Sequence, residues 1–167
     1  RNTVIDDTST SETRVWSSKK IVDTFTKKEQ TSVGSSVVCL PTRHFSNRLF
    51  ARSQTLWASF MVQVGKKQIY IGGDGGYDDR FLRIRQQFGE IDLAIMENGQ
   101  YNVDWANVHL MPNDLRQAIL DLQPKQVFTV HHNRFALAKH AWDEPQKVAQ
   151  SIAENDSVLL LDSHIGQ

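Results

Sequence analysis

The chain has 167 residues, of which 40% are hydrophobic and 23% charged, and its 19 basic residues balance 19 acidic ones. This length suits one domain with a hydrophobic core, or a large part of a bigger domain, and the balanced charge argues against a surface that binds nucleic acid or an anionic membrane. Cys39 is the only cysteine, which excludes an internal disulfide, and within an apolar run it is expected to be buried as a small core residue. No apolar stretch approaches the roughly 18 residues that span a bilayer, and we expect a cytoplasmic protein.

The first half of the chain carries patterns of β-structure. Residues 1–13 are a polar lead-in, rich in Ser and Thr. Runs of apolar and β-prone residues then predict strands in four places, at 20–26, 35–40, 56–64 and 68–71. The tight turn Gly65-Lys66-Lys67 joins the last two of these strands, so they are predicted to form a hairpin.

The second half alternates between helical and strand patterns. Apolar residues at helical spacing predict helices over 79–88 and 113–122, and Asp143 is a candidate N-cap for a third helix over 143–155. Continuous apolar runs predict three buried strands, at 91–96, 126–130 and 157–161. Strands followed by alternating β and α elements predict an α/β (α+β) fold.

Three of the predicted strands are followed by residues of the types that bind metals in proteins. His44 follows the strand 35–40, Asp74 follows 68–71, and His131-His132 follow 126–130. Two glycines stand on each side of Asp74, so other backbone can approach this loop closely. Imidazoles and a carboxylate delivered to one edge of a sheet match the ligand set of zinc or another divalent ion.

Each of these residues also has an ordinary structural interpretation. Glycine and aspartate are common in turns, and the glycine-rich stretch lacks the following Lys-Ser/Thr of a phosphate-binding loop. His44 alone is compatible with a polar loop residue. Neighbouring residues at a strand end point to opposite faces, so at most one of His131 and His132 is expected to be a ligand.

Five segments in chain order resemble motifs of one family. They are PTRHFSNR at 41–48, IGGDGGY at 71–77, FGEIDLAI at 88–95, VHLMP at 108–112 and VHHNRFAL at 130–137. They resemble the P-A-x-H-F/W-S-x-R, F-x-G-D-T-G-Y, F-G-x-I-D-L-A-x, H-x-N-P and V-H-W-G-T-F-A-L segments of metallo-β-lactamase-fold hydrolases. The similarity is to the branch that contains N-acyl-phosphatidylethanolamine-hydrolysing phospholipase D.

The resemblance implies roles for individual residues. It makes His44 and His131 metal ligands and Asp74 the carboxylate that bridges two ions, which are Zn²⁺ or another divalent metal such as Mn²⁺. Asp74 and His109 are the implied catalytic residues, and Tyr77 is a further candidate for substrate contact. His132 stands where the family has Trp, Asn133-Arg134 replace Gly-Thr, and Met111 replaces an Asn, so the substrate pocket is expected to differ.

The family's H-x-H-x-D-H motif is absent from the 167 residues. The resemblance therefore implies the C-terminal half of an αββα sandwich, a fragment of a metal-dependent hydrolase of ester, lactone or phosphodiester bonds that is inactive alone. Its expected partners are a small or lipid-like substrate and either the missing N-terminal half or a second copy covering the exposed sheet. The alternative is a non-catalytic α/β interaction domain without metal.

Overall fold

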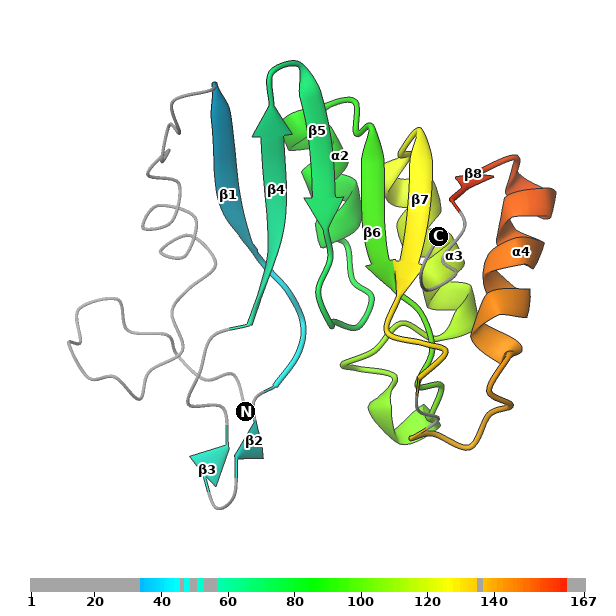
Figure 1. Ribbon diagram of the computed structural model, residues 1–167. Helices are drawn as coiled ribbons and strands as arrows, with labels where there is room; N and C mark the ends of the chain where they lie inside the picture. Colours follow the sequence, from blue (N-terminus) through cyan, green and yellow to red (C-terminus); the bar gives the residue numbers. More distant parts are fainter. Residues whose placement is uncertain (1–33, 46, 49–50, 53–56, 135–136, 162–167) are drawn as a thin grey trace.

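The computed structural model describes residues 34–45, 47–48, 51–52, 57–134 and 137–161 (Figure 1). The polar lead-in at 1–13 and the candidate strand at 20–26 lie outside these residues. The mixed α/β class predicted from the sequence is confirmed, because the described part contains a six-stranded sheet with three α-helices.

The sheet has the strand order β1-β4-β5-β6-β7-β8. Its strands are β1 (Ser35–Pro41), β4 (Ala58–Val64), β5 (Lys67–Ile71), β6 (Leu93–Glu97), β7 (Gln126–Val130) and β8 (Leu159–Leu160). The first three are antiparallel, and β5 to β8 pair in parallel. The two-residue strands β2 (Asn47–Arg48) and β3 (Ala51–Arg52) form a separate pair.

The predicted hairpin is present between β4 and β5. Val64 pairs with Lys67 across the turn, and Gly65 adopts a left-handed φ of 58° that a glycine accommodates without strain. The last strand is shorter than predicted, because Ser157 takes a left-handed conformation as the C-cap of the preceding helix and delays the start of β8.

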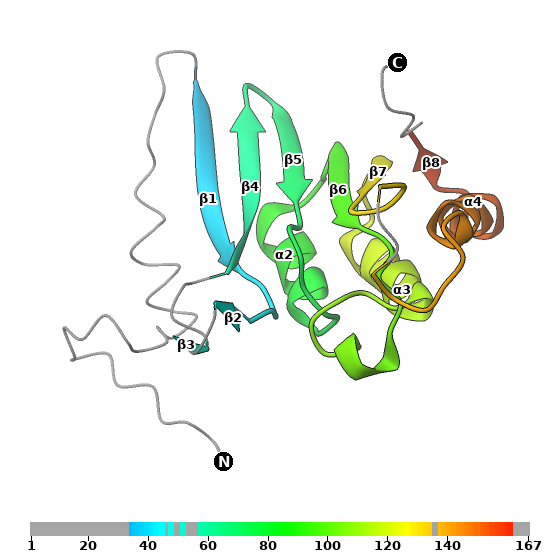
Figure 2. The ribbon, with the colours of Figure 1, turned by 60° about the horizontal axis from the view of Figure 1, so that its bottom comes forward.

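The helices α2 (Arg80–Phe88), α3 (Pro112–Leu122) and α4 (Glu144–Asp156) agree closely with the predicted ranges. Figures 1 and 2 show α2 and α3 on one face of the sheet and α4 beside β8 at its edge. Asp143 occupies the N-cap position of α4 as predicted, but its side chain makes no capping hydrogen bond and pairs with Lys147 Nζ at 2.7 Å instead.

The hydrophobic core lies between the sheet and the helices. From the sheet it includes Met61, Tyr70, Ala94 and Val127, and from α3 it includes Leu115, Ala118, Ile119 and Leu122, all of them buried. The apolar stripe of α3 seen in the sequence is therefore the surface that packs on the strands.

The opposite face of the sheet is also apolar, and Figure 1 views it directly. Val37, Phe60 and Val64 are 47%, 38% and 47% exposed on it. Cys39 pairs with Phe60 on this face and is only half-buried, so the prediction of a core cysteine was wrong. The reason is the alternation of β1, in which Val38 and Leu40 point into the core and Cys39 points the other way. Partial burial still raises the pKa of the Cys39 thiol.

Candidate metal centre

The loop that carries Asp74 is held by close contacts on both sides. A Cβ added to Gly75 would lie 2.0 Å from Thr42 Oγ1, and one added to Gly76 would lie 2.4 Å from the Asn107 carbonyl oxygen. The Thr42 hydroxyl donates to the Asp74 carbonyl at 3.3 Å, and the Gly76 N–H donates to the Arg43 carbonyl at 2.9 Å. The glycines are needed because the loop after β1 and the loop before α3 press directly on this backbone.

Asp74 and His131 lie next to each other although 56 positions separate them in the sequence. Asp74 Oδ2 is 3.7 Å from His131 Nε2. Two atoms bound about 2.1 Å from one tetrahedral ion lie roughly 3.4 Å apart, so this pair is close to the spacing that one divalent ion requires. His131 reaches this position from the end of β7 with a left-handed φ of 71°, a backbone conformation that is strained for a residue with a side chain.

The ring of His109 connects His131 with His44. His109 stacks on His131 with ring centroids 5.4 Å apart, and it meets His44 edge-on at 5.2 Å. Nδ1 of His44 is 2.7 Å from the Phe45 carbonyl oxygen. A carbonyl only accepts hydrogen bonds, so Nδ1 carries the proton and Nε2 is the nitrogen of His44 able to bind a metal.

His132 and Tyr77 make other contacts. His132 Nε2 lies 2.9 Å from the Thr129 hydroxyl. The Tyr77 hydroxyl donates to Asp121 Oδ2 at 2.7 Å, and this hydrogen bond raises the pKa of Tyr77 to about 12. The structure thus engages Tyr77 with α3 rather than leaving its hydroxyl free for a substrate.

Glu97 is the residue of this cluster that the sequence analysis missed. It is the last residue of β6 and is 1% exposed. Its Oε1 accepts hydrogen bonds from the N–H groups of Gly75 at 2.8 Å and Leu110 at 3.1 Å, and its Oε2 lies 2.6 Å from Nδ1 of His109. One buried carboxylate therefore connects the Asp74 loop, the end of β6 and the segment that carries His109.

Glu97 also sets the state of His109. The carboxylate accepts, so Nδ1 of His109 donates and Nε2 faces away from Glu97. Burial of the ring disfavours its charged form, but the hydrogen bond and the charge of Glu97 outweigh burial, and the pKa of His109 is raised. A sequence signal existed, since a glutamate ends the apolar run IDLAIM, but the strand was predicted to stop one residue earlier.

Two groups of possible metal ligands share His131: one adds Glu97 and His109, and the other adds Asp74. Glu97, His109 and His131 present ligand atoms within 4.8 Å of one another, and Asp74 extends the group through His131. Carboxylate oxygens and imidazole nitrogens in this arrangement fit a divalent ion such as zinc. Both oxygens of Glu97 already accept hydrogen bonds, which leaves Asp74 as the carboxylate free to bind a metal.

The chain belongs to the β-lactamase superfamily. A family model described as "Beta-lactamase superfamily domain" matches residues 7–132. Outer membrane protein RomA of Klebsiella pneumoniae is 48% identical over 99 residues, which are 59% of this chain and 75% of that protein. The mitochondrial N-acyl-phosphatidylethanolamine-hydrolyzing phospholipase D of Saccharomyces cerevisiae is 32% identical over 120 residues, 68% of this chain and 26% of that protein.

A solved structure shows the same fold. Igni18, a metallo hydrolase from the archaeon Ignicoccus hospitalis, superposes with a TM-score of 0.64 at 16% identity, covering 81% of this chain and 52% of that one. The chain thus spans about half of this structural relative and about a quarter of the yeast enzyme.

The metallo-β-lactamase fold implies binding of a divalent metal, in agreement with the ligand atoms present. Within the described residues, none of the helices is both long and apolar enough to cross a membrane.

Proposed function

We propose that the chain is part of a metal-dependent hydrolase that cleaves ester or phosphodiester bonds. The observation that carries the proposal is the convergence of Asp74, His109 and His131 around the buried carboxylate of Glu97. Hydrolases among the relatives and the solved structures support the class of reaction.

His44, Asp74 and His131 are the proposed metal ligands, with Zn²⁺ or Mn²⁺ as the metal and two ions in the complete protein. When bound, such ions supply a water acidic enough to act as nucleophile near neutral pH. The role of Glu97 is to orient His109, and Nε2 of His109 is then placed to accept or donate a proton at the substrate.

The exposed apolar face of the sheet indicates that another polypeptide segment packs on it. A continuous apolar face of this kind is normally covered, and here it carries Val37, Phe60 and Val64. We propose that the N-terminal half of the fold covers it in the complete protein and supplies the remaining metal ligands. The isolated chain is accordingly expected to have little activity.

The test compares residues 1–167 with the longest natural form of the protein, each supplied with zinc or manganese. p-Nitrophenyl esters and bis(p-nitrophenyl) phosphate are the substrates. We expect the longer form to hydrolyse one class and Asp74→Asn to abolish that activity. Glu154→Gln, which neutralises an exposed carboxylate on α4, is the matched control and should leave it unchanged. Equal turnover by the longer form and its Asp74→Asn variant would refute the proposal.

One observation favours a second function. The open apolar face is also what a non-catalytic interaction domain would present. Such a domain needs no metal, so failure of the longer form to retain any divalent ion would favour this alternative.

A further inference from the structure

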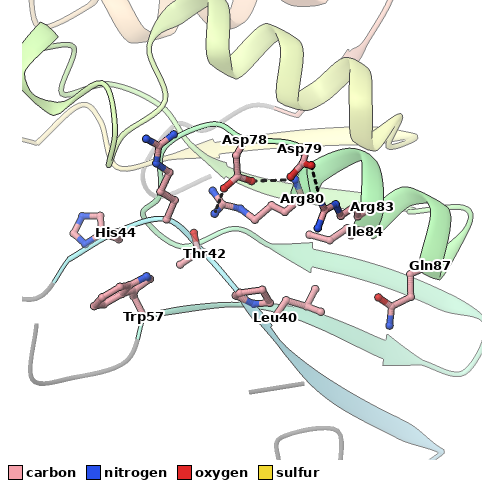
Figure 3. Close-up of a pocket in the computed structure, with 12 residues that line it drawn as sticks. Leu40, Thr42, His44, Trp57, Asp78, Asp79, Arg80, Arg83, Ile84 and Gln87 are labelled. Atoms are coloured by element: carbon pink, nitrogen blue, oxygen red, sulfur yellow. Dashed lines mark hydrogen bonds and ion pairs between the residues drawn. The ribbon is translucent and has the colours of Figure 1, made fainter. Parts of the chain in front are cut away.

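A pocket of about 470 Å³ lies between β1 and α2, beside His44 (Figure 3). This volume is in the range of sites that hold small molecules, roughly 300–1,000 Å³. Figure 3 shows His44 at one end and Gln87 at the other, with α2 along one side. Asp74, Glu97 and His131 do not line this pocket, whereas Thr42, Arg43 and His44 do.

One wall of the pocket is apolar. Leu40 and Ile84 line it together with Trp57 and Pro41. Leu40 and Ile84 are 2% and 5% exposed, so the pocket reaches down to the edge of the core. An apolar group of a few carbons can pack against these side chains.

The side of the pocket formed by α2 also carries cationic groups. Residues 80, 83, 84 and 87 are spaced three or four apart and form one stripe of α2 that faces the pocket. Arg80 is 9% exposed, and its Nε is buried without a hydrogen-bond partner in the described part of the chain, although its other nitrogens are bonded. These hydrogen bonds hold the guanidinium in place, so Arg80 contributes a fixed positive charge to this side of the pocket.

The charge of the lining favours an anion. Three guanidinium groups, on Arg43, Arg80 and Arg83, stand against two carboxylates, on Asp78 and Asp79, which leaves one net positive charge (3 − 2). Arg83 pairs with Asp79 at 2.5 Å, but both side chains are largely exposed, at 73% and 67%. Such a pair is worth little, so Arg83 can turn to a ligand at small cost.

We propose that this pocket binds an amphiphilic anion, a small molecule with a carboxylate or phosphate group on a short apolar body. The apolar body would lie against Leu40 and Ile84, and the anionic group would meet Arg80 and Arg83. His44 lines the pocket and is one of the proposed metal ligands, so a link between this pocket and hydrolysis rests on the proposed function. Binding itself depends only on the pocket, so it can be tested separately from hydrolysis.

The experiment is a calorimetric titration of the full chain with hexanoate, hexyl phosphate and the neutral control hexanol, in EDTA to exclude metal effects. We expect saturable binding of at least one anion and none of hexanol. The tighter of hexanoate and hexyl phosphate identifies the anionic group as carboxylate or phosphate.

Three variants locate the site. Arg83→Gln should weaken binding roughly 1.5- to 5-fold, and Asp79→Asn should strengthen it by a similar factor by releasing Arg83. Asp79 makes no capping hydrogen bond to α2, so its replacement leaves the helix start intact. Arg85→Gln is the matched control, because Arg85 lies about 200° around the helix from Arg83 and is absent from the lining. Equal effects of Arg83→Gln and Arg85→Gln, equal binding of hexanol, or no saturable binding of either anion would overturn the proposal.

Discussion

At the scale of single residues, the candidate site depends on groups that position other groups. Glu97 accepts hydrogen bonds from two backbone N–H groups and from His109. Gly75 leaves room for Thr42 where any side chain would collide. The buried carboxylate of Glu97 therefore fixes the position of His109 and of the loop that carries Asp74. The absence of a side chain at Gly75 lets Thr42 pack against that loop.

Glu97→Gln keeps the shape of the side chain but removes its charge. The amide oxygen can still accept from backbone, whereas the hydrogen bond to His109 loses its charged partner. We expect the free energy of unfolding to fall by about 1–3 kcal/mol, measured by urea denaturation in EDTA. Glu154→Gln, the same change at an exposed carboxylate on α4, is the control and should have little effect; equal effects would contradict the role assigned to Glu97.

Gly75→Ala tests the close approach of Thr42. The new Cβ would lie 2.0 Å from Thr42 Oγ1 and 3.4 Å from Thr42 Cβ, so the collision is with the hydroxyl. We expect a loss of about 1–3 kcal/mol in unfolding free energy, partly recovered in the double variant Gly75→Ala/Thr42→Ala. Strictly additive effects of the two substitutions would show that they do not meet.

At the scale of elements, strong periodicity decided what could be predicted. The ranges of α3 and β7 follow from apolar spacing alone, since both pack on the core through one continuous apolar surface. The sequence of β1 did not show which of its faces packs on the core, because both faces are apolar. Cys39 lies on the open face. Glu97 was missed for a related reason: its partners come from loops distant in sequence, and their meeting depends on the parallel order of β5, β6 and β7.

Asp92 links β5 to the start of β6. Its carboxylate accepts from the Gln68 N–H at 3.0 Å and pairs with Lys67 and Lys125. The hydrogen bond from Gln68 and then the lysines hold the pKa of Asp92 well below its ordinary value. A depressed folded pKa contributes stability above the unfolded value of about 3.9, and this contribution is lost as the pH falls through the lower folded value.

We therefore expect Asp92→Asn to be less stable than the unchanged chain at pH 7, with the difference shrinking as the pH is lowered below about 4. Thermal unfolding across this range is the measurement. Asp104→Asn, at an exposed carboxylate, should show no such trend. A stability difference that stays constant from neutral to acidic pH would contradict the role of Asp92.

At the scale of the whole molecule, the sheet is covered on one face only in the described residues. Val37, Phe60 and Val64 are exposed on the other face, and the chain spans only about a quarter of the yeast relative and about half of the archaeal structure. We expect the isolated chain to self-associate through this face. Sedimentation should show Phe60→Ser shifted toward monomer, whereas Val103→Ser, at a valine that is 85% exposed away from the sheet, should behave like the unchanged chain. An unaltered distribution in Phe60→Ser would argue that the face is not the contact.

We expect Asp74 and His131 to bind one divalent ion together. The most direct test is metal analysis of the chain after dialysis against zinc, with Asp74→Asn, His131→Gln and the control Glu154→Gln treated in parallel. Zinc should remain with the unchanged chain and with Glu154→Gln and should be lost from both site variants. Equal zinc content in all four proteins, or none in any of them, would contradict it.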